Sequence, residues 1–122
     1  MNDTLPPKAR GLRRILNAFA YSRDGLLATF RSEAAFRQEA IAAAVMIPLA
    51  FFIAPDRVFL ALMIASVLLV LIVELINSAI EATVDRFGAE RHPLAKHAKD
   101  AGSAAVLISL ILAATVWLAA LT

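Results

Sequence analysis

Four polar side chains recur at helical spacing just after the most apolar part of the chain. Glu74, Asn77, Glu81 and Asp85 are spaced i, i+3, i+7 and i+11, so a helix would carry all of them on one face. The apolar run from residue 58 to residue 73 precedes them without a break. Acidic groups this close to a bilayer are rare unless they face a partner, a cavity or an ion. We therefore expect a site here, and a divalent metal ion carrying phosphate as its ligand.

The acidic residues differ in the chemistry that their positions allow. Glu74 and Glu81 are two helical turns apart, about 10 Å, which is too far for both to chelate one small ion. Magnesium takes one or two carboxylates together with phosphate and water, and Glu33, just before the first apolar segment, is a third candidate carboxylate. Glu74 lies deepest and is the candidate general base. Lys99 and Asp100 stand where the third apolar helix is expected to begin, and free N–H groups at a helix start favour a phosphate.

Plainer roles stay open for the same residues. Glu74 and Asn77 could form a polar clamp between helices, worth about 0.6–2 kcal/mol. Asp85 and its neighbours could be a solvated cap on the membrane helices. Tyr21 and Trp117 are typical of side chains that anchor a helix at the membrane interface. The spacing is compatible with a structural face as well as with a catalytic one.

The composition indicates an integral membrane protein. Of the 122 residues, 61% are hydrophobic and 18% are charged, whereas about a quarter of the residues of soluble domains are charged. A helix of about 20 residues spans the hydrocarbon core of a bilayer. The sequence therefore predicts a single all-α membrane domain over residues 1–122, with a disordered tail over 1–11, an amphipathic surface helix over 12–31, and membrane helices over 34–54, 58–87 and 101–121.

The positions of the basic residues predict the orientation of the chain. Eleven of the twelve Lys and Arg residues precede the first span or lie between the second and third, and only Arg57 lies between the first and second. The positive-inside rule then puts the N-terminus in the cytoplasm and the C-terminus outside. A net charge of +2, without basic runs interleaved with aromatic residues, predicts no nucleic-acid partner.

Three segments carry a resemblance to a known family. They are residues 33–39 (EAAFRQE), 74–86 (ELINSAIEATVDR) and 98–106 (AKDAGSAAV). They resemble segments of the prokaryotic diacylglycerol kinases, and the likeness runs from about Arg14 to Trp117. The resemblance implies a homotrimer in the bacterial inner membrane. It also implies in-line transfer of the γ-phosphate of ATP, assisted by Mg²⁺, to diacylglycerol at the cytoplasmic face, which yields phosphatidic acid.

The resemblance also implies roles for individual residues. Glu74 matches the catalytic base of the family, and Glu33 and Glu81 match its metal ligands. The residues that match ATP-binding positions are Arg14, Tyr21, Glu33, Glu81, Glu90, Arg91, His92, Lys99 and Asp100. The residues that match positions lining the active site or the lipid pocket are Glu39, Glu74, Asn77, Ser103 and Trp117. Asn17 and Phe19, on the expected surface helix, depart from the family pattern.

Two other functions are weighed beside this one. Undecaprenol kinase is similar in the regions 74–81 and 99–100, but Gln38 and Glu39 favour the diacylglycerol branch. A small channel or accessory protein would use Glu74 and Glu81 as an ion-conducting face and would need no ATP. Consumption of Mg-ATP that requires lipid distinguishes a kinase from the latter class.

The active site is expected to be shared between subunits. Three membrane helices are too few to enclose the glutamates and Lys99 around a metal and phosphate and still leave a lipid groove. We expect Arg14 and Glu33 from one chain to meet the residues from Glu74 to Lys99 of the next.

Overall fold

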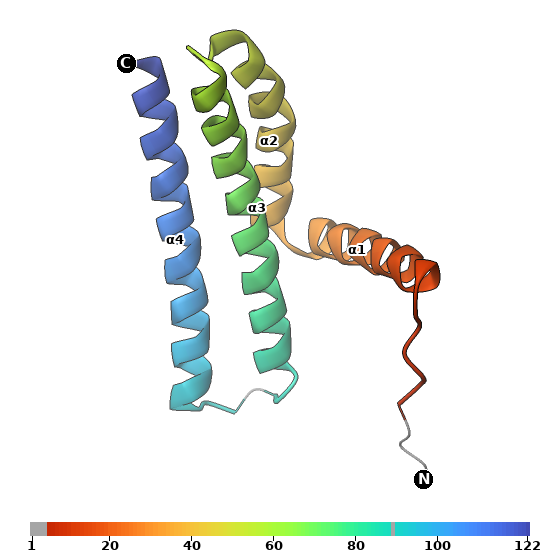
Figure 1. The fold of residues 1–122 in the computed structure, drawn as a ribbon. Helices are drawn as coiled ribbons and strands as arrows, with labels where there is room; N and C mark the ends of the chain where they lie inside the picture. The colour runs from red at the N-terminus through yellow and green to blue at the C-terminus, as the bar shows by residue number, and fades with distance from the viewer. Residues whose placement is uncertain (1–4, 89) are drawn as a thin grey trace.

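The computed structural model describes residues 5–88 and 90–122, which form four α-helices (Figure 1). They are α1 (Leu12–Ser32), α2 (Ala34–Ile53), α3 (Arg57–Asp85) and α4 (Pro93–Leu121). Helix α3 packs on both α2 and α4, whereas α1 projects away from this bundle. The all-α prediction is confirmed. The first four residues of the expected tail lie outside the described residues.

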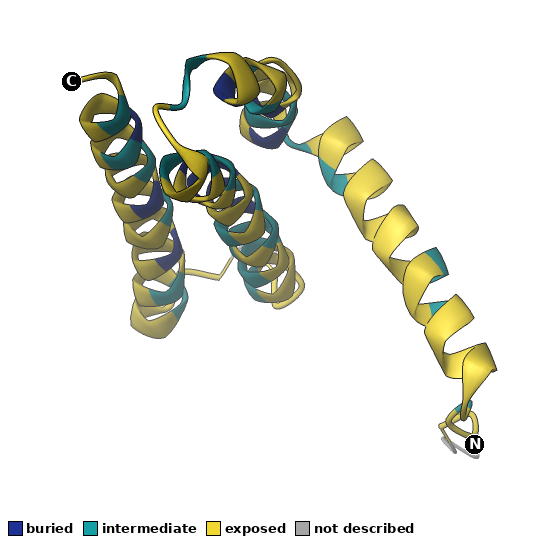
Figure 2. Ribbon diagram, turned by 45° about the horizontal axis from the view of Figure 1, so that its top comes forward, coloured by how far each residue is buried: buried dark blue, intermediate teal, exposed yellow. Residues whose placement is uncertain are grey.

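Helices α2, α3 and α4 are long and apolar enough to cross a membrane. They contain 20, 29 and 29 residues, which correspond to about 30–44 Å at 1.5 Å per residue. In the most apolar window of each helix, only 17%, 22% and 17% of the residues are buried inside the protein. Figure 2 shows the exposed outer faces of these helices. The prediction of three long apolar helices is confirmed, and their outer faces need an apolar environment.

The core of the bundle lies where the three apolar helices meet. Ala50 of α2 and Met63 of α3 are fully buried, and Trp117 of α4 packs against them. The indole Nε1 of Trp117 donates a hydrogen bond to the carbonyl oxygen of Met63 at 3.3 Å. The ring and the N–H group of Trp117 are both satisfied inside the bundle, so Trp117 belongs to the core, and its expected place at the membrane interface stays a prediction.

A short hairpin connects α2 to α3 and makes them antiparallel neighbours. Asp56 caps α3, because its side chain accepts a hydrogen bond from the backbone N–H of Phe59 at 2.8 Å. At the other end of α3, Gly88 adopts a φ of 96° two residues beyond the C-cap Arg86. A positive φ favours glycine, so the chain turns there toward α4.

Helix α4 begins eight residues earlier than the sequence predicted. It starts at Pro93 rather than at Ala101, so Asp100 lies inside the helix and the expected helix start at residues 99–100 is wrong. His92 is the N-cap, and its Nδ1 accepts a hydrogen bond from the backbone N–H of Leu94 at 3.1 Å. Proline suits the first helical position because it has no N–H to satisfy. Hydropathy marks only the part of a helix that is apolar, and this first part of α4 is polar.

The joint between α1 and α2 is a single extended residue, Glu33, with φ −114° and ψ 108°. Its backbone N–H donates to the carbonyl oxygen of Thr29 at 2.8 Å, and its own carbonyl accepts from the N–H of Arg37 at 3.0 Å. The guanidinium of Arg37 also donates to the carbonyl oxygens of Phe30 and Arg31, at 2.8 and 3.2 Å. These bonds satisfy the end of α1 and hold Glu33 at the corner.

Candidate functional site

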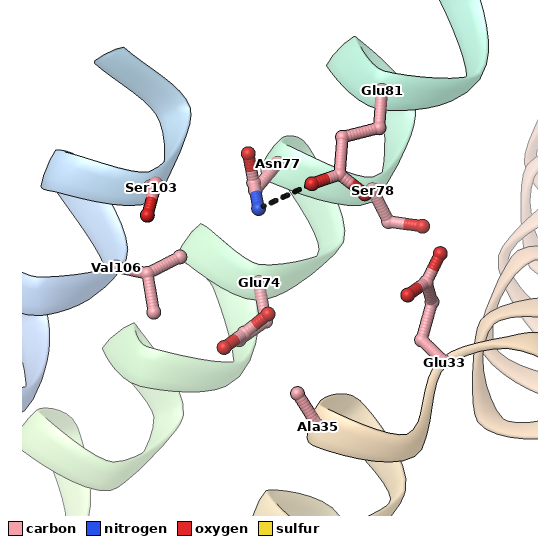
Figure 3. A pocket seen from close by; sticks show the side chains of 8 residues that line it. All are labelled: Glu33, Ala35, Glu74, Asn77, Ser78, Glu81, Ser103 and Val106. Carbon is pink, nitrogen blue, oxygen red and sulfur yellow. Dashed lines mark hydrogen bonds between the residues drawn. The ribbon is translucent and has the colours of Figure 1, made fainter. Parts of the chain in front are cut away.

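A pocket of about 220 Å³ lies where the start of α2 faces the C-terminal half of α3 and the first half of α4. Figure 3 shows the side chains around it. Three of the candidate acidic residues, Glu33, Glu74 and Glu81, line this one pocket. The complete lining consists of Glu33, Ala35, Glu74, Asn77, Ser78, Glu81, Ser103 and Val106.

Helix α3 supplies the largest part of the pocket through a single face. Glu74, Asn77, Ser78 and Glu81 stand at i, i+3, i+4 and i+7, which is the spacing of neighbours along one side of a helix. The sequence predicted this face, but it did not identify Ser78, although Ser78 shares the helical period with Glu74. Glu33 reaches the pocket from the joint between α1 and α2, and in Figure 3 its carboxylate points toward Ser78 and Glu81.

Glu74 is the most enclosed acidic residue of the pocket, with 8% of its surface exposed. The carboxyl groups of Glu39 on α2 and Glu74 on α3 lie near one another. Glu39 Oε2 is buried and has no hydrogen-bond partner among the described residues. Two carboxyl groups can form a hydrogen bond only if one of them carries a proton. A proton on either carboxyl group would allow the pair to form such a hydrogen bond beside the pocket.

Asn77 joins Glu81 to the interface between α3 and α4. Its Nδ2 donates a hydrogen bond to Glu81 Oε1 at 3.5 Å, and its Oδ1 is buried without a partner among the described residues. Across the interface, α4 contributes Ser103 to the pocket, with Gly102 immediately before it against Asn77. Gly102 is a residue of this region that sequence analysis missed, because only the packing of α4 on α3 shows what it contacts.

A second, larger pocket of about 1,180 Å³ lies beside the turn between α3 and α4. It contains five residues that the family resemblance assigns to ATP binding: Glu90, Arg91, His92, Lys99 and Asp100. Two ion pairs cross or border it. Lys99 Nζ lies 2.6 Å from Asp85 Oδ1, and Lys96 Nζ lies 2.5 Å from Asp100 Oδ2. Asp85, weighed above as part of a solvated cap, is thus a lining residue of this pocket.

Some of the sequence candidates lie away from both pockets. Arg14 and Tyr21 are exposed on α1 and line neither pocket of their own chain. Trp117 lies 14 residues beyond Ser103 on α4, about 21 Å along the helix axis, and belongs to the core. Glu39 does not line the smaller pocket but lies near Glu74, which does.

The acidic side chains of the pocket supply only part of a metal site. Within residues 5–88 and 90–122, no group of three or more His, Cys, Asp or Glu side chains is close enough to hold a metal ion. Glu33 and Glu81 nevertheless line one pocket, and two carboxylates suit Mg²⁺, which keeps water and phosphate oxygens in the rest of its coordination sphere. The donor set therefore fits a magnesium ion that arrives with a phosphate ligand.

Comparison with known proteins agrees with this chemistry. The family model described as prokaryotic diacylglycerol kinase matches residues 20–121. A diacylglycerol kinase of Pseudomonas aeruginosa is 59% identical over 107 residues, which cover 88% of this chain and 87% of that protein. A diacylglycerol kinase of Escherichia coli (strain K12) is 50% identical, over 88% of each chain. One from Haemophilus influenzae is 48% identical, over 90% of this chain and 93% of its own.

These matches extend well beyond the three segments on which the resemblance was first based. They include the joint at Glu33 and all of α2, α3 and α4. The resemblance inferred from the sequence is confirmed, and this chain belongs to the prokaryotic diacylglycerol kinase family.

Proposed function

We propose that this protein uses ATP to phosphorylate diacylglycerol to phosphatidic acid, at the cytoplasmic face of the bacterial inner membrane. The observation that carries the proposal is the convergence of Glu33, Glu74 and Glu81 on one pocket. The diacylglycerol kinases to which the chain is similar support the choice of lipid. Phosphoryl transfer needs mainly positioning of the reactants and neutralisation of charge, which carboxylate-bound metal and cationic side chains supply.

Glu74 is the proposed general base. It would accept the proton of the lipid hydroxyl as the oxygen attacks the γ-phosphorus of ATP, and the bond from that phosphorus to the β,γ-bridging oxygen breaks. Its low exposure keeps bulk water away from the attacking oxygen. Glu39, Asn77 and Ser103 surround it and would hold the lipid head group.

The larger pocket is the proposed nucleotide site. Its volume of about 1,180 Å³ lies slightly above the usual range of ligand pockets, about 300–1,000 Å³. Arg91 and Lys99 supply positive charge for the phosphates, and His92 and Glu90 would contact the rest of the nucleotide. Asp100 is also proposed to contact the nucleotide. Arg14 and Tyr21 line neither pocket of their own chain, so we propose that they contact the ATP bound to a neighbouring subunit.

Magnesium is the proposed cofactor, with Glu33 and Glu81 as its protein ligands. Both carboxylates line the smaller pocket, and Glu81 retains an oxygen that Asn77 does not use. When bound, the ion would neutralise charge on the transferred phosphate.

A homotrimer embedded in the membrane is the proposed assembly. A folded monomer of 13.1 kDa is expected to expose about 6,400 Å², whereas this chain exposes 9,565 Å². Much of the excess is apolar surface on α2, α3 and α4, which lipid or other subunits would cover. Helix α1 exposes Leu12, Ile15, Leu16 and Phe19, and we propose that it lies on the cytoplasmic leaflet through these side chains.

The test uses purified protein in lipid vesicles with Mg-ATP and either diacylglycerol or undecaprenol. We expect phosphate to be transferred to diacylglycerol, and more slowly to undecaprenol, with Glu74→Gln protein as the inactive control. Faster transfer to undecaprenol would overturn the proposed substrate. ATP that is not consumed with either lipid would overturn the kinase assignment, and ion flux through the same vesicles would favour a channel.

A further inference from the structure

Gly102 lies where α4 comes close to the pocket-forming face of α3. It is buried, and a Cβ atom built on its backbone would lie 3.2 Å from Asn77 Cγ and would overlap Asn77 Oδ1. Gly25, which lies inside α1, is different, because a Cβ atom there would meet nothing within 4 Å. The position of the Asn77 side chain is therefore available only while residue 102 has no side chain.

The orientation of the Asn77 carboxamide follows from its two neighbours. Its Nδ2 faces the Glu81 carboxylate and donates to it, whereas the reverse orientation would bring two oxygens together. Its Oδ1 then points to the interface beside Gly102, where it is buried and has no hydrogen-bond partner among the described residues. A buried oxygen without a partner is unfavourable. The bond to Glu81 and the space at Gly102 together keep it there.

We propose that Gly102 is a positioning residue for the Glu81 carboxylate and acts through Asn77. The space at residue 102 accommodates the Asn77 carboxamide between α3 and α4. In this position the carboxamide holds Glu81 Oε1 through its hydrogen bond. Glu81 Oε2 is thereby left for the metal and nucleotide. This role rests on the proposed kinase function, in which Glu81 is a ligand of Mg-ATP.

Gly102→Ala tests the proposal, with Gly25→Ala as its matched control. Each change adds one methyl group to a glycine inside a helix, but only the first meets Asn77. We expect Gly102→Ala to raise the apparent KM for Mg-ATP about tenfold, the effect of losing one hydrogen bond to a charged group. The kcat should change by less than about threefold, because Glu74 is not displaced. Gly25→Ala should match the wild type in both.

A double-mutant cycle separates this role from simple packing. In an Asn77→Ala background there is no carboxamide to displace, so adding Gly102→Ala should change the KM no further. If instead Gly102→Ala raises the KM by the same factor with and without Asn77, the proposal is wrong. If the Gly102→Ala single variant does not assemble, the variant that carries both Asn77→Ala and Gly102→Ala tests the proposal instead. It should assemble and behave as Asn77→Ala does, and its failure to assemble would overturn the role.

Two further readouts separate this inference from the proposed function. Binding of Mg-ATP without lipid, measured by calorimetry, should weaken about tenfold in Gly102→Ala, whatever the lipid substrate is. The thermal unfolding temperature of Gly102→Ala in detergent should stay close to that of Gly25→Ala. A wild-type protein without kinase activity would overturn the proposed function. An active wild type with an unchanged KM in Gly102→Ala would overturn only the role of Gly102.

Discussion

The ammonium group of Lys99 on α4 lies 2.6 Å from the carboxylate of Asp85 at the end of α3. The pair joins the two helices on either side of the turn and occupies the pocket proposed for ATP. Its side chains are 45% and 63% exposed, so solvent screens the attraction and the pair adds little to stability. Its importance is that Asp85 holds the cation that a phosphate would need.

Asp85→Asn should therefore tighten nucleotide binding. The substitution removes both a competitor for Lys99 and one negative charge beside the phosphates, so the KM for ATP should fall about two- to fivefold. Steady-state kinetics at constant ionic strength would measure this change. The matched control is Asp24→Asn, which removes a carboxylate paired with Arg23 on α1 and should leave the KM unchanged. A higher KM in Asp85→Asn would mean that Asp85 orients Lys99 for ATP instead of competing for it.

Glu74 and Glu81 line the same pocket, but their substitution should change different kinetic constants. Glu74→Gln removes the proposed base and should lower kcat by about 100-fold or more with little change in the KM for ATP. Glu81→Gln should raise the apparent KM for both Mg²⁺ and ATP by about tenfold or more, because it removes a charged ligand. Titrations of each variant with Mg²⁺ and ATP would separate the two effects. Equal, mild effects of both substitutions would refute these roles.

The proximity of Glu39 to Glu74 predicts a difference between two substitutions of Glu39. Glutamine can donate a hydrogen bond to the Glu74 carboxylate, as a protonated Glu39 does, whereas alanine cannot. Glu39→Ala should lower kcat about ten- to 100-fold, the effect of leaving a buried charged group without its partner. Glu39→Gln should lower it less than tenfold. Initial rates at saturating lipid and Mg-ATP would compare them, and equal losses would show that no shared proton is needed.

The sequence predicted those parts of the fold and site that depend on local spacing. Glu74, Asn77 and Glu81 were placed on one face because the helical period is local, and the apolar segments were identified because a bilayer requires long apolar helices. The start of α4 was missed because polar residues 93–100 form a helix through a local cap at His92, which hydropathy does not detect.

Contacts between helices could not be predicted in the same way. The outer surfaces of α2, α3 and α4 are as apolar as their core, so hydrophobic periodicity does not indicate which side of a helix faces its neighbour. The approach of Glu39 to Glu74 and the seat of Asn77 against Gly102 both depend on that packing. The packing of Trp117 in the core was not predicted for the same reason, since an indole suits a membrane interface and a core with a free carbonyl equally well.

The geometry of the pocket also changes what mixed oligomers should do. The sequence alone suggested that Glu33 and Glu81 meet across two subunits, but both residues of a single chain line one pocket. A second chain is thus not needed to bring them together. If both serve the pocket of their own chain, Glu33→Gln and Glu81→Gln proteins mixed before assembly should recover no activity, because every site contains one defective glutamate.

Arg14 provides the matched comparison, because it is exposed on α1 and lines neither pocket of its own chain. If it serves a neighbour's site, mixing Arg14→Ala with Glu81→Gln in equal amounts should restore about a quarter of the sites, the product of two half-chances in a closed ring. For both mixtures, the kinase activity would be measured and divided by the amount of oligomer verified to contain both variants. Recovery from the Glu33 and Glu81 variants would place these two residues in a site shared between subunits. Absence of recovery from the Arg14 and Glu81 variants would instead assign Arg14 to its own chain.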